Sequence, residues 1–461
     1  MSVVRDRSWT IAPTLFWFGG CLLASLLYFD GDLSAIAGRM TQQREPDVAT
    51  AAGPTFAPKP VQVADADPPE ERPATVLPDR GDRQRVGALE DVCVDGTPTA
   101  CKRWGMDGFY RSVSDSKKGK LGRAIRVSWY GDSVIATDAI PSRLRGKLQS
   151  TYGDGGPGFV YLVAPHKFCH HEQVERTQSG WTPYGISTTA VSDKLYGAGG
   201  STAESYGGTA KLTLKTGAAN AEVYYLTQPK GGSLAITSGG SELLKVETAG
   251  EAKAAGYASA KVAGAKKLEF EAKGKVRTFG VALENPAGIV VDNFGIVSVN
   301  VKSFGNHDPA FFTGELAHRK ADLLMIMIGA NEAAWLGPGD RDTKDYAARY
   351  KPVLEMLRKG RPDASCLVIS PTDQAEAKDG AYPSRPVMPV LVEAQRKAAA
   401  AAGCAFFSTY DWMGGKGSAS KWFSKRYVGS DFQHLTVAGA AKMGDALYEA
   451  LTTGFGRYAG P

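Results

Sequence analysis

The sequence predicts an α/β fold whose parallel sheet is interrupted by an all-β segment. From Ala124 onward, short apolar runs alternate with helical patterns, which is typical of βαβ units with helices on both faces of a sheet. The alternation stops within residues 165–287, which are rich in glycine and in short strand-like runs, and then resumes. We therefore expect a three-layer α/β/α domain in two parts, 91–164 and 288–461, with an inserted β-sandwich at 165–287.

The first 40 residues predict a membrane anchor. Trp9–Phe29 is an uncharged run of about 21 residues, which is long enough as a helix to cross the hydrocarbon core of a bilayer. Arginines precede the run and aspartates follow it, so the positive-inside rule predicts a cytoplasmic N-terminus. We expect residues 1–40 to be a cytoplasmic stub and an uncleaved transmembrane helix in the inner (cytoplasmic) membrane, with the rest of the chain periplasmic or extracellular. Cleavage near Ala35–Ala37 and a buried core helix are the alternatives.

Residues 41–90 predict a disordered linker. They contain eight of the chain's 25 prolines and a single aromatic residue, Phe56. Such a segment cannot bury enough apolar area to offset its ordering entropy. It is typical of a tether that holds a globular head away from a membrane.

Strands and helices are predicted in alternation along the two α/β parts. In the insert, all the predicted elements are strands. The strands of the parallel sheet are expected at 125–130, 323–328, 366–370 and 405–408, and the helices at 135–152, 344–359, 387–402 and 436–452. Strands of the insert are expected at 210–214, 221–226, 233–237, 268–272 and 277–283.

Composition and cysteine content limit the class of protein. The formal net charge of +6 comes without a basic cluster, which argues against nucleic acid as a partner. Six cysteines are too few for a disulfide-built scaffold. Cys93 and Cys101 flank a Gly-Thr-Pro turn and predict a local disulfide, whereas Cys366 and Cys404 are either a disulfide or two buried thiols. Cys169 is left over, and Cys21 lies within the apolar run Trp9–Phe29.

Ser133 is the first candidate for chemistry. The Gly131-Asp132-Ser133 turn ends a predicted strand and opens a helix, so Ser133 is expected at the carboxyl edge of the sheet. Ligands bind at this edge in α/β folds, and the helix end offers N–H donors to an anion. A turn that only caps the helix is the alternative.

His434 and Asn331 are the candidates that would act with Ser133. Asp431 lies three residues before His434, ahead of the last amphipathic helix, and can orient one imidazole nitrogen while the other reaches a serine. Asn331 follows a predicted strand in Gly329-Ala-Asn331, where its amide can reach the same sheet edge as Ser133. Amide donors at such a site stabilise a tetrahedral oxyanion.

Three motifs in this order resemble the SGNH (GDSL-like) hydrolase superfamily: Gly131-Asp132-Ser133, Gly329-Ala-Asn331 and Asp431-x-x-His434. They correspond to the first, third and last conserved blocks of that superfamily. The run Gly153–Phe159 resembles the bacterial extracytoplasmic subgroup that includes peptidoglycan and other carbohydrate O-acetylesterases. In that subgroup a jelly-roll-like, carbohydrate-module-like β-domain is inserted at this place. The resemblance covers roughly 91–164 and 288–461.

The resemblance implies the role of each candidate in a Ser-His-Asp triad. Ser133 would be the nucleophile, His434 the general base, and Asp431 the residue that orients His434. The oxyanion hole would combine the backbone N–H of Ser133, the side-chain amide of Asn331 and a backbone N–H of a second block.

The second block departs from the family pattern. The candidate segment 293–298 offers Gly295 early, but Ser298 stands where the later glycine is expected. Either residue is a candidate donor to the oxyanion, and the Cβ of Ser298 restricts the turn if that position needs glycine.

Three further residues are candidates for substrate binding. Asp132 adjoins the nucleophile, and Trp181 could stack on a sugar ring, although an aromatic residue of a β-sandwich more often belongs to its core. His307 lies in a turn that either lines the cleft or caps a helix.

No metal or organic cofactor is expected, because acyl transfer through such a triad needs none. Metal-capable side chains cluster at the start of the insert, but all are adjacent, unlike the separated pairs of zinc sites. We interpret them as polar loop residues that line the substrate cleft: His166, Cys169, His170 and His171.

The expected protein is an extracytoplasmic serine esterase that removes O-acetyl groups from a polysaccharide, with peptidoglycan as one candidate. Its expected partners are the acetylated glycan and, through the N-terminal helix, the membrane. An SGNH-type O-acyltransferase acting on envelope glycans and a non-catalytic glycan-binding or assembly protein are the alternatives.

Overall fold

The computed structural model describes residues 85–262, 264–379 and 381–459. The expected anchor at 1–40 and most of the expected linker lie outside these residues. Within the described ranges, no helix has the length and apolar character required to cross a bilayer. The last six residues assigned to the linker, 85–90, contain two short strands that join the central sheet, so that part of the linker prediction was wrong.

The central sheet has seven strands in the order β1-β2-β18-β17-β16-β5-β15. The five strands from β18 to β15 run parallel, and β2 and β1 add antiparallel at one end. All four expected strands of this sheet are present, and an edge strand, β15, was missed. Their bounds are β1 Arg85–Val86, β2 Leu89–Glu90, β5 Ile125–Gly131, β15 Ile289–Gly295, β16 Leu323–Met327, β17 Ser365–Ile369 and β18 Ala405–Phe407.

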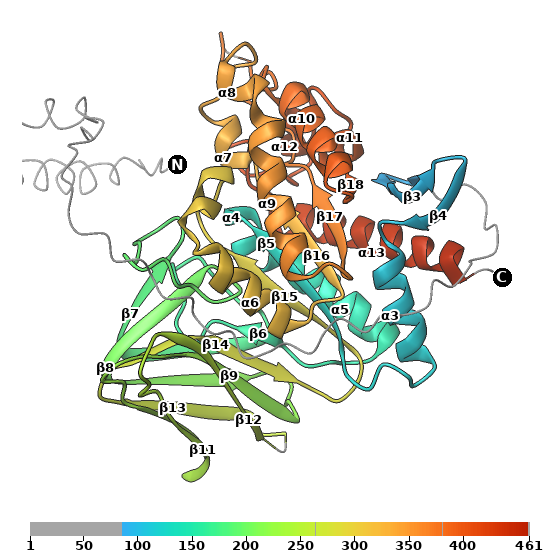
Figure 1. Cartoon of the computed structure of the whole chain (residues 1–461). Helices are drawn as coiled ribbons and strands as arrows, with labels where there is room; N and C mark the ends of the chain where they lie inside the picture. The colour runs from blue at the N-terminus through green and yellow to red at the C-terminus, as the bar shows by residue number, and fades with distance from the viewer. Residues whose placement is uncertain (1–84, 263, 380, 460–461) are drawn as a thin grey trace, which may run out of the picture. The chain divides into compact units, whose positions relative to one another are not determined.

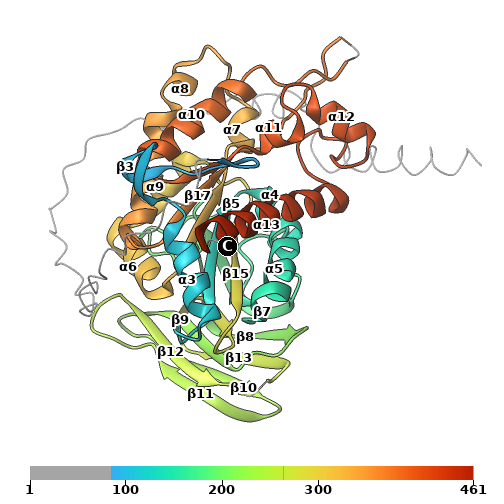
Figure 2. The ribbon, with the colours of Figure 1, turned by 90° about the vertical axis from the view of Figure 1, so that its right-hand side faces the viewer.

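Helices cover both faces of this sheet and make it the middle of three layers (Figure 2). Alternate residues of each parallel strand point to opposite faces, and both sets are apolar because both faces are covered. One face packs on α3 Asp107–Lys117, α5 Ala139–Tyr152 and α13 Val437–Ala459, and the other on α6 Pro309–Arg319, α9 Tyr346–Gly360 and α10 Met388–Ala401.

The helix expected at 135–152 is two helices in the structure. A short helix α4, Ser133–Ala136, ends at Thr137, and α5 begins at Ala139. Asp138 between them has a left-handed backbone with φ 63°, and its buried carboxylate accepts two hydrogen bonds from Arg145, each at 3.0 Å. This bidentate pair holds the break between the helices.

The inserted segment forms one nine-stranded antiparallel sheet that curves nearly into a barrel (Figure 1), not the two separate sheets of the expected sandwich. The bend comes from β8, which pairs with β14 near its start and with β13 near its end. The strands are β6 Gly158–Val160, β7 Val174–Gly185, β8 Ser201–Leu214, β9 Asn220–Thr227, β10 Ser233–Ser238, β11 Ser241–Glu247, β12 Ala254–Lys261, β13 Lys267–Lys273 and β14 Val276–Glu284.

The insert leaves and re-enters the α/β domain at adjacent points. The N–H of Ile289, the first residue of β15, donates to the carbonyl of Gly153 at 3.0 Å. The sheet also takes in β6, which lies before the expected domain boundary at residue 165 and pairs with β14. The two ends of the inserted segment therefore lie next to each other, beside the edge strand β15 of the central sheet.

A buried ionic network joins the two sheets. The guanidinium of Arg319, on α6, donates to both carboxylate oxygens of Asp292 at 2.9 and 2.6 Å and to Glu284 at 2.6 Å. Arg126, on β5, also donates to Glu284 at 2.7 Å. Burial alone would raise the pKa of Glu284, but Arg319 and Arg126 outweigh it and lower that pKa to about 2. Asp292 lies on β15 and Glu284 at the end of β14, so the network fixes one sheet to the other.

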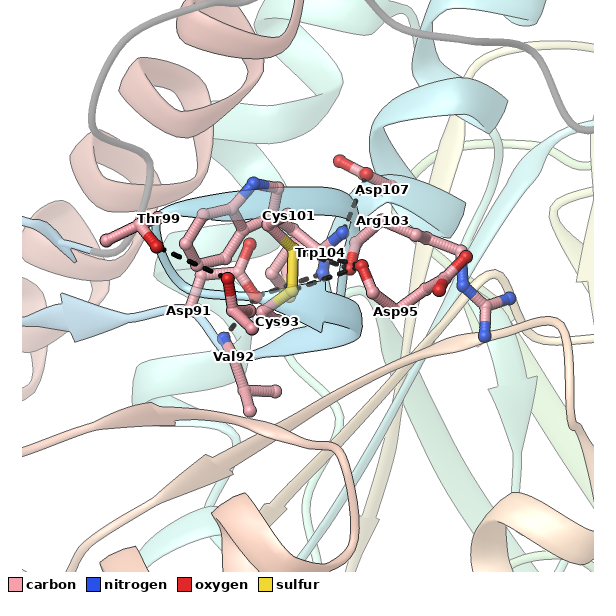
Figure 3. Close-up of a disulfide and its surroundings, with 11 residues drawn as sticks. Asp91, Val92, Cys93, Asp95, Thr99, Cys101, Arg103, Trp104 and Asp107 are labelled. Atoms are coloured by element: carbon pink, nitrogen blue, oxygen red, sulfur yellow. Dashed lines mark hydrogen bonds between the residues drawn. A yellow bond between two sulfur atoms is a disulfide. The ribbon is translucent and has the colours of Figure 1, made fainter.

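Two disulfides and one free thiol account for the described cysteines. Cys93 and Cys101 join strands β3 Cys93–Thr97 and β4 Ala100–Trp104 of a small hairpin (Figure 3), as predicted. Cys366 on β17 and Cys404 just before β18 are also bonded, which decides the alternative left open by the sequence. Cys169 is free and buried.

We predict that Arg319→Met destabilises the protein by about 3–5 kcal/mol, because it leaves the buried charge of Asp292 without its main partner. Urea unfolding at neutral pH measures this loss. Arg143→Met is the matched control, since Arg143 pairs with Asp445 on the surface, where water screens the two charges and an ion pair contributes little to stability. Equal losses in the two variants would contradict the structural role assigned to the network.

Candidate active site

Ser133 lies where the sequence predicted it, at the point where β5 ends and α4 begins. The turn is sharp, since a Cβ at Gly131 would lie 2.3 Å from the side chain of Ile135. Only glycine allows the helix to start so close to the strand. As the first residue of α4, Ser133 has a backbone N–H without an intrahelical acceptor.

The structure brings Ser133, His434 and Asp431 together. Ser133 Oγ lies 2.8 Å from His434 Nε2, and His434 Nδ1 lies 2.6 Å from Asp431 Oδ2. Asp431 and His434 come from one turn ahead of α13, in which the other oxygen of Asp431 accepts the backbone N–H groups of Gln433 and His434 at 3.0 Å. A carboxylate, an imidazole and a hydroxyl in this order form the geometry of a triad.

The electrostatics of the turn favour an ionised Asp431. Partial burial works to raise the pKa of Asp431, but the hydrogen bonds from the ring and backbone of His434 and from Gln433 outweigh it and lower that pKa. The ionised carboxylate accepts the Nδ1 proton of His434, which leaves Nε2 as the lone-pair nitrogen that faces Ser133. The pair is open to solvent, since the side chains of His434 and Asp431 are 42% and 51% exposed.

Asn331 lies at the same edge of the sheet, on the short helix α7, Ala330–Ala333, after β16. Its Nδ2 donates to the carbonyl of Val299 at 2.9 Å. An amide nitrogen carries two hydrogens, so one remains for an oxyanion. The bond to Val299 also ties Asn331 to the turn of the second block.

Gly295 is not a donor to an oxyanion, and this correction has a clear physical cause. Its N–H donates to Asn293 Oδ1 at 2.9 Å within the end of β15. A Cβ at this position would lie 2.3 Å from the backbone nitrogen of Ala136. Gly295 therefore serves the close approach of α4 to the sheet.

Ser298 is the second-block residue that remains. It is exposed in the turn that follows β15, and its φ of 66° lies in the left-handed region that favours glycine. This agrees with the expectation that a glycine position is occupied by serine here. The turn is held by Val299, whose N–H donates to Ile296 and whose carbonyl accepts from Asn331.

Asp132 is a buried capping residue and does not face substrate, contrary to the sequence-based expectation. It is 1% exposed, and its Oδ1 accepts the N–H of Val134 at 3.0 Å. The backbone N–H of Ala330 also bonds to its carboxylate, so Asp132 joins the turn of Ser133 to the turn of Asn331. Burial raises the pKa of Asp132 to about 7.

Trp181 and His307 are also buried, which corrects their assignment as substrate-binding residues. Trp181 is 6% exposed and belongs to the core of the inserted sheet. His307 is 3% exposed, and its ring stacks on Phe312 with centroids 4.0 Å apart. Burial lowers the pKa of His307 to about 3 and keeps the ring neutral. Neither ring offers a free face to a sugar.

The histidine cluster at the start of the insert lines a cavity of about 580 Å³, and none of the triad residues is part of its lining. Within the described ranges, no group of three or more metal-capable side chains is gathered as a metal site would require. His171 is buried, and burial lowers its pKa to about 3. Cys169 is buried as well, and burial raises its pKa.

Sequence reasoning missed Asn293, which holds the second block in place. Its Nδ2 donates to the carbonyl of Ile135 and to Asp138 Oδ1, both at 3.0 Å, while its Oδ1 accepts the N–H of Gly295. Asn293 thus joins the end of β15 to α4, which begins with Ser133. The signal in the sequence was a polar pair, Asp292-Asn293, inside an otherwise apolar run.

Comparisons with known proteins match part of the chain to a sequence family and most of it to a known fold. Residues 264–442 match the model of the GDSL-like Lipase/Acylhydrolase family, a range that includes Asn331, Asp431 and His434 but not Ser133. No curated protein sequence matches the chain significantly.

The solved structures similar to this chain include a peptidoglycan O-acetylesterase, with a TM-score of 0.67 and 23% identity over 80% of this chain and 99% of that one. An acetyl xylan esterase, AlAXEase, has a TM-score of 0.28 and 14% identity over 36% of this chain and 81% of its own. A family two carbohydrate esterase from Clostridium thermocellum has a TM-score of 0.27 and 11% identity over 55% and 95%. The expected resemblance to SGNH hydrolases is confirmed.

We predict that Asp132→Asn changes how stability depends on pH. In the wild type the folded carboxyl keeps its proton up to about pH 7, whereas the unfolded one loses it near pH 4, so stability falls as the pH rises between these values. Asparagine retains the cap without titrating. The free energy of unfolding of the variant, relative to that of the wild type, should therefore rise by roughly 4 kcal/mol at most between pH 4 and pH 7. Urea unfolding across this range measures it, and parallel curves for the two proteins would contradict the shifted pKa.

We predict that Ser298→Gly and Ser298→Val differ sharply. Glycine adopts the left-handed backbone of Ser298 freely, so the variant should keep kcat within about twofold. Valine is β-branched and disfavours that backbone, so the turn should shift and kcat should fall by roughly 10-fold or more. Steady-state hydrolysis of an aryl acetate measures both. Equal activity in the two variants would mean that this turn does not contribute to the oxyanion hole.

Proposed function

We propose that this chain, an SGNH-type ester hydrolase with a GDSL-like domain, removes O-acetyl groups from a polysaccharide outside the cytoplasm, with peptidoglycan as the first candidate. The observation that carries the proposal is the hydrogen-bonded series of Ser133, His434 and Asp431. The fold similarity to a peptidoglycan O-acetylesterase over almost the whole of that protein supports the choice of substrate.

In the first half of the reaction, Ser133 Oγ attacks the carbonyl carbon of the acetyl ester. His434 Nε2 takes the hydroxyl proton, and Asp431 stabilises the imidazolium through Nδ1. The carbonyl oxygen becomes an oxyanion that accepts hydrogen bonds from the backbone of Ser133, the amide of Asn331 and the backbone of Ser298. Removing one such donor costs roughly 10²–10³-fold in kcat.

Collapse of the tetrahedral intermediate breaks the ester bond to the sugar. His434 returns its proton to the sugar oxygen, and the acetyl group remains on Ser133 as an acyl-enzyme. A water molecule, deprotonated by His434, then attacks the acyl carbonyl, and acetate leaves as Ser133 is restored. The solvent exposure of His434 and Asp431 supports access of this water.

The cellular setting is part of the proposal. The apolar run Trp9–Phe29 and the proline-rich residues that follow it favour a single-pass anchor and a tether, with the hydrolase held outside the cytoplasmic membrane. A glycan of the cell envelope is the polymer that such an arrangement would bring within reach.

An O-acyltransferase would use the same triad, with a sugar hydroxyl in place of water. Such an enzyme would hydrolyse the ester slowly in water. Its turnover would rise, through acyl transfer, when a glycan acceptor is supplied. A non-catalytic glycan-binding protein would not react with a fluorophosphonate at Ser133. The intact hydrogen-bond geometry of the triad favours a reactive serine over this second alternative.

We predict that the full chain releases acetate from O-acetylated peptidoglycan or O-acetylated xylan, and that Ser133→Ala and His434→Ala each lower kcat by about 10³-fold or more. Asn331→Ala should lower kcat by roughly 10²–10³-fold and so retain measurable activity. Acetate assay on both polymers, beside an aryl acetate, measures these rates. No release from either polymer and no turnover of the aryl ester would overturn the esterase proposal.

A further inference from the structure

The loop after β17 packs on the turn that carries the catalytic histidine. It folds into a hairpin with bridges between Ala375 and Ser384 and between Lys378 and Ala381. The N–H of Ala375 donates to the carbonyl of Phe432, which lies in the turn between Asp431 and His434. Ala375 and Phe432 share a small hydrophobic cluster with Ala419, at the start of α12 Ser418–Ser424.

Three aromatic rings gather at this contact. Phe432 is 6% exposed, and its ring stacks on Tyr382 of the hairpin, with centroids 4.3 Å apart and an angle of 17° between the planes. The ring of Phe423, on α12, lies 4.5 Å from that of Phe432. Tyr382 and Phe423 are themselves 49% and 41% exposed. The turn with His434 is therefore bordered by two aromatic rings that remain open to solvent.

Such exposure is informative because large apolar side chains are usually covered, and exposed groups of them mark binding surfaces. Other large hydrophobic side chains exposed in the described part of the chain include Phe168, Tyr206 and Trp335. Tyr382 and Phe423 differ from these in contacting one shared ring that lies two residues from His434.

We propose that Tyr382 and Phe423, which we call the aromatic platform, bind a sugar ring of the glycan chain beside the sugar whose ester is cleaved. The inference rests on the proposed function and extends it to a subsite. The rings contact Phe432, two residues from His434, so we assign the platform to the part of the polymer that continues past the reacting sugar. An aromatic face packs on the C–H face of a sugar and leaves the hydroxyls at its rim free to form hydrogen bonds.

Polar groups around the rings favour a saccharide over an acyl chain. The hairpin that carries Tyr382 also carries the ion pair of Arg385 and Glu376, at 3.0 Å and partly exposed. Ser420, on α12 beside Phe423, donates its hydroxyl to the carbonyl of Tyr382. Flat apolar faces bordered by polar donors and acceptors suit a carbohydrate, whereas an acyl chain requires a continuous apolar groove.

The test compares a polymer with a small ester in the full chain. In Tyr382→Ala and Phe423→Ala, kcat/KM for O-acetylated peptidoglycan should fall by roughly 3–10-fold relative to kcat/KM for an aryl acetate, mainly through KM. Tyr382→Phe keeps the ring and should keep the ratio. Tyr206→Ala is the matched control, since Tyr206 is a 72% exposed tyrosine on β8.

Three results would overturn the proposal. The first is an unchanged ratio in both alanine variants. The second is an equal loss on both substrates, which would mean that the rings only support the turn with His434. The third is a selective loss on aryl esters of longer acyl chains, such as an octanoate, which would make the platform an acyl site.

A binding measurement separates this inference from the proposed function. Ser133→Ala protein is sedimented with peptidoglycan, with and without Tyr382→Ala. If the wild type releases no acetate but Tyr382→Ala still weakens binding 3-fold or more, the esterase proposal fails and the platform stands. If the wild type is active and binding is unchanged, the platform fails alone.

Discussion

The buried contact of Arg319 with Asp292 and Glu284 is the constraint on which the arrangement of the two sheets depends. Charges removed from water are tolerated only when their partners hold them in good geometry, so β14, β15 and α6 have little freedom to move relative to one another. Aromatic packing accompanies this alignment. The ring centroid of Phe294, on β15, lies 5.1 Å from those of both Phe159, in the inserted sheet, and Tyr130, in the central sheet. Because β15 ends in the turn with Ser298, the same network also holds one wall of the active site.

The site is assembled from the carboxyl ends of three neighbouring parallel strands and one turn from the end of the fold. The strand β5 leads to Ser133, β15 to the turn with Ser298, and β16 to Asn331. Cross-links between these ends are short polar contacts: Asn331 to Val299, and Asp132 to the backbone of Ala330. The rigid sheet thus fixes the positions of Ser133, Ser298 and Asn331, while the solvent-exposed turn carries His434.

The sequence was sufficient to predict that Ser133, His434 and Asp431 lie together and to locate the central strands, because these signals are local. A strand that ends in Gly-Asp-Ser and an Asp three residues before a His encode their own turns. The failures depend on tertiary packing. Nothing local distinguishes the buried ring of Trp181 from the exposed ring of Tyr382, and β15 was missed because Asp292 and Asn293 interrupt its apolar pattern until Arg319 and α4 satisfy them. The break at Asp138 likewise depends on Arg145, seven residues away.

The hydrogen bond between Ser133 and His434 joins residues that are 301 positions apart, with the whole inserted sheet between them. A contact of such separation closes a long loop, which costs more chain entropy than a local contact does. During synthesis Ser133 is made long before His434, so a partly made chain holds this serine without its histidine partner. In the proposed reaction, hydrolytic activity appears only when the last turn docks, which ties the onset of that activity to completion of folding.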